Sequence, residues 1–376
     1  MSTTTIERIE AFACSLPLDQ PLDLGTYLVA ARDYAVVKVV TSGGLTGAAI
    51  GLSRRAPVDM AVAEVLAPVL IGKDALHLTA CLAAMDRVTD GMGRSGIVGR
   101  ARSLVDIALH DIRARSAALP LWRLLGGSPD PVEVMIVEGY RIANEPEGSL
   151  VDRLLGRVEQ GYRRLKIEAG SYDRPEKLVQ VLESFRRQSA APRIILDGLW
   201  RWKTSQEAAR YLAHLRAFDI DWIEDPFPVE LIDCYRQFQR FERVVPVGAG
   251  DDLTYFRDVE ALMEAPVDVL RLDALSIGGV TAFGELAAAA KKRGCAVSPH
   301  FYPQIHQHCV FGWGASDHVE MIPSDRPFDR THELIRHDAF ARVKNGRLAA
   351  PGDIGAGYEL DDEAVERSAR RKTVAG

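Results

Sequence analysis

The chain has 376 residues, more than one ordinary compact core needs, so we expect a large domain together with a second, smaller one. Its formal net charge is −6 with both signs mixed along the sequence, so we expect no nucleic-acid partner and no membrane surface. Residues 1–10 lack an apolar signal core, no run could span a bilayer, and the five cysteines are scattered, which together predict a cytoplasmic protein with reduced thiols.

Residues 1–127 have the pattern of a small α+β domain. Two stretches alternate between apolar and polar side chains, as antiparallel strands do, and three others place apolar residues on one helical face. Gly126 and Gly127 then suit the end of a helix, so we set a domain boundary after residue 127. In chain order we expect strands at 3–14 and 34–51 with a tight turn at 41–47, loops at 16–32 and 51–57, and helices at 60–70, 76–89 and 100–116.

From residue 128 onward, short apolar strands alternate with helix-length segments, and each strand runs into a polar residue. The clearest strand, at 219–223, ends in Glu224 ahead of Pro226 and Pro228, which cannot continue a strand. Each repeat has the size of a βα unit, so we expect a parallel barrel over residues 128–330 with its chemistry on the carboxyl face. The expected strands and their polar residues are 132–137 with Glu138 and Tyr140, 164–167 with Lys166 and Glu168, 193–196 with Asp197, 219–223 with Glu224, 244–247 with Asp251, 267–272 with Asp273, 295–299 with His300, and 318–319 with Glu320.

Three acids end successive strands of this barrel: Asp197, Glu224 and Asp251. If the barrel closes, their carboxylates converge, and three buried like charges are too costly to ionise together without a counter-ion. A hard divalent cation with oxygen ligands removes that cost. Mg²⁺ fits because it takes few carboxylates and keeps positions for water and a substrate carboxylate.

The next two strands end in Asp273 and His300. An aspartate hydrogen-bonded to an imidazole fixes its tautomer and raises its basicity, so this pair predicts a general base that works near neutral pH. Lys166, on the other side of the barrel, can hold the carboxylate of a substrate as a point charge.

The chain resembles the mandelate racemase/muconate-lactonising branch of the enolase superfamily, and the match extends through nearly the whole sequence. Each matching segment alone is weak evidence, but the combination of segments is specific to this family. The resemblance is carried by residues 101–127, 161–166, Asp197, 222–228, 248–252, 272–279, 298–300 and 345–360.

This resemblance implies a modified TIM barrel, (β/α)₇β, under an α+β capping domain formed by the N-terminal region and by residues 331–376, which would pack back on it with a polar strand near 340–347. It implies Mg²⁺ at the three acids and removal of the proton α to a carboxylate, with the metal and Lys166 stabilising the enediolate. Asp273 and His300 match the dyad of the mandelate racemase subgroup. Glu320 matches a residue that hydrogen-bonds the substrate carboxylate.

The chain departs from the pattern of this family at three positions. Where Lys-x-Lys is common on the second strand, this chain has Lys166 followed by Glu168, so the amine that would act as base on the second face is missing. Leu199 replaces the Asn of Asp-x-Asn, and Asp251 is one methylene shorter than the Glu that is often the third ligand.

Racemisation needs an acid/base group on each face of the α-carbon, and only the face of His300 clearly has one. Elimination of water is therefore favoured, and we expect a lyase that dehydrates an acid sugar to a 2-keto-3-deoxy acid. The alternatives are a racemase, epimerase or cycloisomerase that uses Glu168 as second base, and a metal-binding homologue without catalysis. We expect Glu168 to position substrate, with its pKa kept low by Lys166 and the cation.

Specificity is expected to lie in loops near 16–27 and 51–56 and in side chains at the mouth of the barrel. We expect a small-molecule carboxylate as substrate and a homo-oligomer, from dimer to octamer. The candidate contacts are Arg54, Arg55, Tyr140, Glu168, Arg201, Trp202, Tyr302 and His306.

Overall fold

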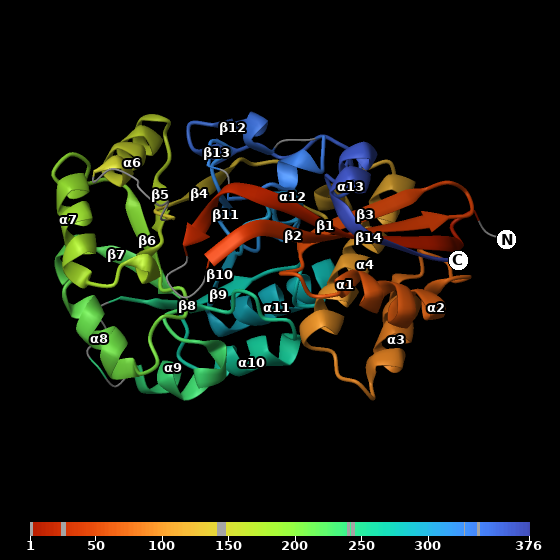
Figure 1. Cartoon of the computed structure of the whole chain (residues 1–376), viewed down its shortest axis with the longest axis horizontal. Coiled ribbons are helices and arrows are strands. Elements are labelled where there is room, and N and C mark those ends of the chain that lie inside the picture. The colour runs from red at the N-terminus through yellow and green to blue at the C-terminus, as the bar shows by residue number, and fades with distance from the viewer. Residues whose placement is uncertain are drawn as a thin grey trace.

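The computed structural model describes residues 3–23, 28–140, 148–238, 241, 245–326, 328–336 and 339–376. One half of the molecule is built on a four-stranded antiparallel sheet, in the order β14-β1-β2-β3, and the other half on a parallel barrel (Figure 1). The sheet brings together both ends of the sequence, because the last strand pairs with the first. Its strands are β1 (Ile6–Asp23), β2 (Leu28–Thr41), β3 (Thr46–Leu52) and β14 (Ala369–Ala375).

The loop expected at residues 16–32 was wrong, because β1 and β2 continue as a long hairpin. Leu16 pairs with Arg32 and Leu22 with Val29, and the register shifts between Pro17 and Leu22. This irregularity accommodates prolines that would interrupt a regular ladder. The hairpin extends from the sheet toward the barrel (Figure 1).

The sheet packs on the helix α4, which carries the apolar face expected from the sequence. Leu104 and Ile112 are buried on that face. A Cβ added at Gly47 would lie 2.0 Å from the carbonyl oxygen of Ala108, so only glycine lets β3 approach the helix this closely. The helices of this half are α1 (Val58–Met60), the π-helical η1 (Ala61–Leu66), α2 (Ala67–Leu70), α3 (Leu78–Thr89), α4 (Gly96–Ser116) and α5 (Leu121–Leu124).

Eight strands form the barrel, in parallel ladders from β4 through β10, and β11 pairs with β4 to close it. They are β4 (Val132–Glu138), β5 (Arg164–Ile167), β6 (Arg193–Asp197), β7 (Ile220–Glu224), β8 (Val247–Ala249), β9 (Val269–Leu272), β10 (Ala296–Pro299) and β11 (His318–Met321). The helices between them are α6 (Ser149–Glu159), α7 (Pro175–Arg186), α8 (Ser205–Ala213), α9 (Ile232–Phe238), α10 (Phe256–Glu264), α11 (Gly279–Arg293) and α12 (Pro303–Trp313). The expected (β/α)₇β barrel is therefore confirmed.

The C-terminal residues contribute to both halves. The strand expected at 340–347 is a short hairpin that turns at Asn345 and Gly346, both with positive φ, and it pairs with β4 of the barrel. Only the final strand, β14, joins the capping sheet. The remaining elements are β12 (Val343–Lys344), β13 (Arg347–Leu348), α13 (Asp362–Ser368) and the 3₁₀ turns η2 (Ala169–Ser171), η3 (Arg216–Phe218), η4 (Val229–Leu231), η5 (Thr331–Glu333) and η6 (Ala339–Arg342).

Among the described residues, no helix is both long and apolar enough to cross a membrane, and all five cysteines are free.

A buried histidine joins the two halves and makes stability depend on pH. His308 on α12 accepts a hydrogen bond from the backbone N–H of Trp122 at 3.1 Å, and burial lowers the pKa of His308 to about 3. An unfolded histidine titrates near ~6.5, so this contribution is complete above that pH and is lost as pH falls toward 3.

We therefore expect the free energy of unfolding to fall less steeply from pH 7.5 to pH 5 in His308→Asn than in the wild type. Asn keeps an acceptor but does not titrate, so the two slopes should differ by up to ~1.4 kcal/mol per pH unit. Urea titrations of both proteins across this range measure it. Equal slopes in the two proteins would exclude His308 as the titrating group.

Candidate active site

The polar residues predicted from the strand ends gather at the carboxyl end of the barrel. Six of them line one small cavity of about 40 Å³. Glu224, Asp273 and Glu168 are almost wholly buried beside it. The capping half closes the other side with Arg32 of β2, Leu52 at the end of β3 and Arg54 of the segment after it. The six are Tyr140, Lys166, Asp197, Asp251, His300 and Glu320.

Lys166 lies among three carboxylates. Its Nζ is 2.9 Å from Oδ2 of Asp197, 2.9 Å from Oε2 of Glu224 and 2.8 Å from Oε1 of Glu320. Burial alone would lower the pKa of Lys166, but these neighbours outweigh burial and raise the pKa well above its ordinary value. The side chain is therefore a fixed positive charge in the wall of the cavity, suited to hold an anion and not to accept a proton.

Arg271, which our sequence reasoning missed, is a second fixed cation. It is fully buried on β9, its Nε is 3.0 Å from Oε2 of Glu224, and its Nη2 donates to Oε2 of Glu320. Its Nη1 donates to Ser298 and to the carbonyl of Pro299. The sequence did contain a signal for this residue. Arg271 stands inside an apolar strand two residues before Asp273, and residues two apart in a strand lie on the same face.

The ion pair between Arg271 and Glu320 helps to keep the Glu320 carboxylate ionised. Burial would raise the pKa of Glu320, but Arg271 and Lys166 outweigh it and hold the pKa well below its usual range. The backbone N–H of Phe301 also donates to this carboxylate at 2.9 Å. An ionised carboxylate only accepts hydrogen bonds, and here Glu320 accepts from Lys166, Arg271 and Phe301, so its implied hydrogen bond to a substrate carboxylate stays a prediction. Here Glu320 orients the two cations.

We expect Arg271→Met to lower the free energy of unfolding by about 3–5 kcal/mol, because Glu224 and Glu320 stay buried and lose one of the two cations that they share, with only Lys166 remaining. Arg236→Met is the matched control, because Arg236 makes an exposed ion pair with Asp233 and should cost under ~1 kcal/mol. Urea unfolding of both variants measures the difference. Equal losses would mean that the buried pair contributes nothing beyond a surface pair.

His300 is held by two carboxylates at one ring nitrogen. Its Nδ1 lies 2.9 Å from Oδ1 of Asp251 and 3.2 Å from Oδ2 of Asp273. Burial would lower the pKa of His300, but Asp251 and Asp273 outweigh burial and raise it. Asp273 is itself fixed by the backbone N–H of Leu275, which donates to its Oδ1 at 2.8 Å. The predicted dyad is thus close together, and Nε2 is the nitrogen left to face a ligand.

His306, a candidate substrate contact, belongs instead to the support of this dyad. Its Nδ1 donates to the carbonyl of Phe301 at 2.5 Å, and its Nε2 accepts from the backbone N–H of Ala274 at 2.9 Å. Both nitrogens are used and the ring is fully buried, so the imidazole is not available to a substrate.

Arg201, predicted to bind substrate, points away from the cavity. Its guanidinium donates to the carbonyl of Gly170 at 2.8 Å. The cause is a left-handed turn at Leu199 and Trp200, with φ of 50° and 52°, which places these two side chains in the cavity wall instead.

Three other candidate contacts do not line the cavity. The Trp202 ring packs against Tyr211 with centroids 5.0 Å apart, and the buried Tyr302 packs behind His300 with ring centroids 6.0 Å apart. Arg55 is exposed and lies 3.8 Å from Asp33. Of the predicted loop at 16–27, residues 24–27 lie outside the described part of the chain.

Tyr140 and Arg54 remain candidate substrate contacts. Tyr140 lines the cavity and packs against Phe328 with ring centroids 4.8 Å apart. Arg54 also lines it, and together with Arg100 of α4 it pairs with Asp252. These pairs tie the capping half to the barrel at the residue after Asp251.

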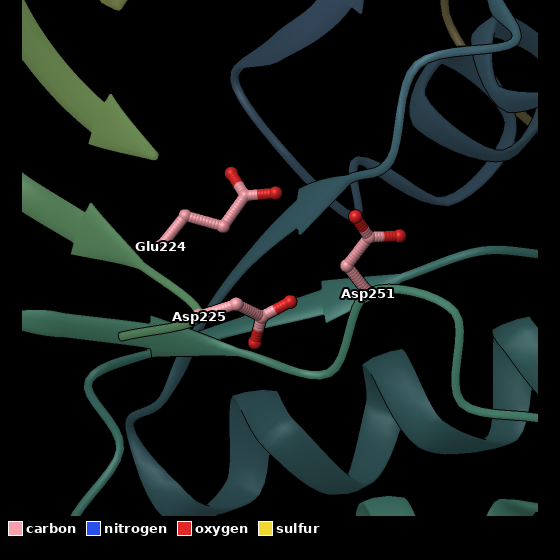
Figure 2. Close-up of side chains that lie close together, drawn as sticks. All are labelled: Glu224, Asp225 and Asp251. Atoms are coloured by element: carbon pink, nitrogen blue, oxygen red, sulfur yellow. The ribbon is translucent and has the colours of Figure 1, made fainter. Parts of the chain in front are cut away.

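Three carboxylates form a group that could hold a cation: Glu224, Asp225 and Asp251 (Figure 2). One oxygen from each lies within 4.8 Å of the others. Oε2 of Glu224 pairs with Lys166 and Arg271, but Oε1 of Glu224 and Oδ2 of Asp225 are buried without a hydrogen-bond partner among the described residues. Burial raises the pKa of Glu224 to about 7. Such oxygens fit a hard divalent cation, which would supply further positive charge.

Asp225 was not among the predicted ligands, and Asp197 lies outside this group. Asp197 accepts the backbone N–H of Leu199 at 2.9 Å, and its other oxygen faces Lys166. Because Lys166 touches both Asp197 and Glu224 at 2.9 Å, the two carboxylates still border the same space.

The low pKa predicted for Glu168 assumes a bound cation beside it and stays a prediction. Glu168 is fully buried, and neither of its oxygens has a hydrogen-bond partner among the described residues. Burial and then the like charge of Asp197 raise its pKa well above the ordinary value, and the attraction of Lys166 does not compensate.

Comparison with known proteins matches both halves of the chain. Residues 8–126 match the N-terminal domain of the mandelate racemase / muconate lactonizing enzyme family, and residues 149–364 match the enolase C-terminal domain-like family.

Two curated relatives and one solved structure extend over nearly the full length. L-talarate/galactarate dehydratase of Salmonella typhimurium is 26% identical and covers 96% of this chain and 90% of its own. Chloromuconate cycloisomerase of Cupriavidus pinatubonensis is 25% identical, over 97% and 99%. A racemase from Streptomyces coelicolor, solved with bound magnesium, superposes with a TM-score of 0.85 at 25% identity, over 97% and 99%.

Proposed function

The chain belongs to the mandelate racemase/muconate lactonizing enzyme family of the enolase superfamily, and on that premise we propose that it removes the proton α to the carboxylate of an acid sugar and eliminates water to give a 2-keto-3-deoxy acid. The observation that carries this proposal is the position of His300. It lines the same cavity as the Lys166 ammonium, and its Nδ1 is held near Asp273.

The carboxylates of Asp197, Glu224 and Asp251 would hold Mg²⁺, with Asp225 beside them. Oε1 of Glu224 and Oδ2 of Asp225, both buried and without a hydrogen-bond partner among the described residues, support this assignment. When bound, the cation supplies positive charge that favours the negative charge developing on the substrate carboxylate. Magnesium bound to the Streptomyces racemase is in keeping with this cofactor.

His300 takes the proton. The cation that Asp251 would hold offsets the negative charge that raises the pKa of His300. With its Nδ1–H directed at Asp273, the neutral imidazole keeps the tautomer in which Nε2 is the acceptor. Lys166 balances the charge that develops on the substrate carboxylate as the α C–H bond breaks. The imidazolium of His300 then returns its proton to the departing β-hydroxyl, which leaves as water, and the resulting enol tautomerises to the 2-keto acid.

Isomerisation is the second candidate, since relatives include a cycloisomerase and a racemase. It requires a base on the opposite face of the α-carbon. Among the predicted residues, only Glu168 stands where the family often has that base, and its two unpartnered oxygens favour this alternative.

A panel of acid sugars, incubated with the Mg²⁺-loaded protein and read by ketone formation, tests dehydration. We expect a 2-keto-3-deoxy acid from at least one member. Change of configuration without ketone would replace dehydration by epimerisation.

Glu168→Gln separates the two reactions. If His300 alone moves the proton, the variant keeps most of kcat and mainly raises KM, because Glu168 then only positions ligands. Exchange of the α-proton with solvent that persists in His300→Asn but vanishes in the double variant His300→Asn/Glu168→Gln would make Glu168 a second base. That result would establish the isomerase alternative.

A further inference from the structure

Arg32 of the capping half lines the proposed active site without an anionic partner. It is 7% exposed and borders the small cavity together with Lys166 and His300. Its Nε donates to the backbone carbonyl of Phe328, and within the described chain neither Nη1 nor Nη2 has a hydrogen bond or an ion pair. These two nitrogens are also not fully enclosed by protein, so a ligand in the cavity can reach them.

The charges of the other cations described at this cavity are already compensated. Lys166 contacts three carboxylates, and Arg54 pairs with Asp252. A buried charge without a counter-ion is costly, so Arg32 favours an anionic group on whatever enters the cavity. A carboxylate suits it best, because its two oxygens match the fork of a guanidinium.

The guanidinium is held in place before any ligand binds. Tyr34 lies two residues further along β2 and therefore on the same face of the strand. Its hydroxyl donates to Oδ1 of Asp329 at 3.0 Å and accepts from the backbone N–H of Arg330 at 3.0 Å. Together with the hydrogen bond from Arg32 to Phe328, these contacts fasten the hairpin that reaches toward the barrel (Figure 1) to the segment after β11. Such preorganisation lowers the entropy lost when a ligand binds.

Arg32 lies across the mouth of the barrel from the proposed cation site. The strands follow one another from β4 to β11 and β11 pairs with β4, so β11 is four strands away from β7 in either direction. The segment after β11, which holds Arg32, therefore faces Glu224 at the end of β7. A substrate whose α-carboxylate is held at Lys166 and the proposed cation site would turn its other end to Arg32.

The space for such a substrate is not limited to the small cavity. Arg54, Trp200 and Asp251 line this cavity and also an adjoining one of about 390 Å³. That volume is within the range of small-molecule sites.

On the premise of the proposed function, we propose that Arg32 determines specificity by binding a second carboxylate, at the end of the acid sugar remote from the α-carbon. The substrate is then a dicarboxylic acid sugar, an aldarate, and not an aldonate, which ends in a hydroxymethyl group. A terminal hydroxyl accepts a hydrogen bond from Arg32 but leaves its buried charge without a counter-ion.

An aldarate and the aldonate of the same configuration are matched probes, because they differ only in the terminal group, as glucarate and gluconate do. Titration calorimetry on Mg²⁺-loaded His300→Asn measures their binding without turnover. We expect at least one aldarate of a six-carbon panel to bind about 10- to 100-fold more tightly than its aldonate, the value of a hydrogen bond to a charged group. A panel in which no aldarate is preferred would overturn the proposal.

Arg32→Gln, added to His300→Asn, should abolish this preference by weakening only the aldarate. Arg87→Gln removes an exposed charge from α3 of the same half and is the matched control, in which the preference should persist. Arg32→Lys should retain part of the preference, because it keeps the charge. Equal weakening of both acids in Arg32→Gln would contradict the proposal, and so would a lower urea midpoint of unfolding, which would indicate a structural role.

The role of Arg32 and the proposed dehydration fail in different ways. Dehydration of an aldonate, with no preference for aldarates, would keep the proposed function and overturn the role of Arg32. Tight binding of an aldarate that depends on Arg32, without any dehydration by the wild type, would keep the role of Arg32 and overturn the proposed function.

Discussion

His300→Asn is expected to lower kcat by roughly 10²- to 10⁴-fold, the contribution typical of a general base. Asn is close in size to part of the imidazole and can still face Asp273, but it has no nitrogen that accepts a proton. KM should change far less, because Lys166 and the carboxylate cluster remain to bind the substrate. Steady-state kinetics on whichever acid sugar the panel identifies measures both parameters.

His214→Asn is the matched control for this variant, because His214 is exposed near the end of α8 and should leave kcat unchanged. Asp273→Asn should also be severely impaired, because an amide permits the wrong tautomer of His300. Near-normal turnover in His300→Asn would remove His300 from its assigned role.

Glu224→Gln is expected to lower turnover more than ~100-fold and to weaken Mg²⁺ binding, because it removes charge at the centre of the carboxylate group while keeping volume. Even outer partners of metal ligands are typically worth about 10- to 100-fold. Titration calorimetry with Mg²⁺ gives the binding change independently of turnover.

Glu260→Gln, an exposed Glu on α10, is the matched control and should bind Mg²⁺ like the wild type. Tight Mg²⁺ binding that survives Glu224→Gln would place the cation elsewhere. Circular dichroism of both variants checks that the fold is retained, since Glu224 also contacts Lys166 and Arg271.

Much of the barrel could be predicted because its geometry leaves a repeating signature. A buried parallel strand must end at the carboxyl face, and residues such as Asp197, Glu224 and His300 mark those ends in the sequence. The same rule predicted that these side chains would lie near one another, and they line or adjoin one cavity.

What could not be predicted depended on contacts between residues distant in sequence. Arg271 and Glu320 pair across the barrel, and nothing local to either residue indicates its partner. The left-handed turn at Leu199 and Trp200 turned Arg201 away, although neither residue is a type that favours positive φ.

The degree of burial of each side chain was the other property that the sequence alone could not predict. Glu168 stands close to a lysine in the sequence, but complete burial outweighs the attraction of Lys166 and raises the pKa of Glu168 in the protein itself, so the low pKa expected from the sequence depends on the cation. A loop was likewise expected at 16–32, whereas pairing with β2 and one register shift retain the strand past the prolines at 17 and 21.

Loss of the α-proton signal in ²H₂O, followed by ¹H NMR with the Mg²⁺-loaded protein and the acid-sugar panel, tests the central claim most directly. We predict that the wild type exchanges or eliminates the α-proton of at least one acid sugar, and that His300→Asn and chelation of Mg²⁺ each abolish the loss. Protein that binds Mg²⁺ yet leaves every α-proton in place would instead be a metal-binding homologue without catalysis.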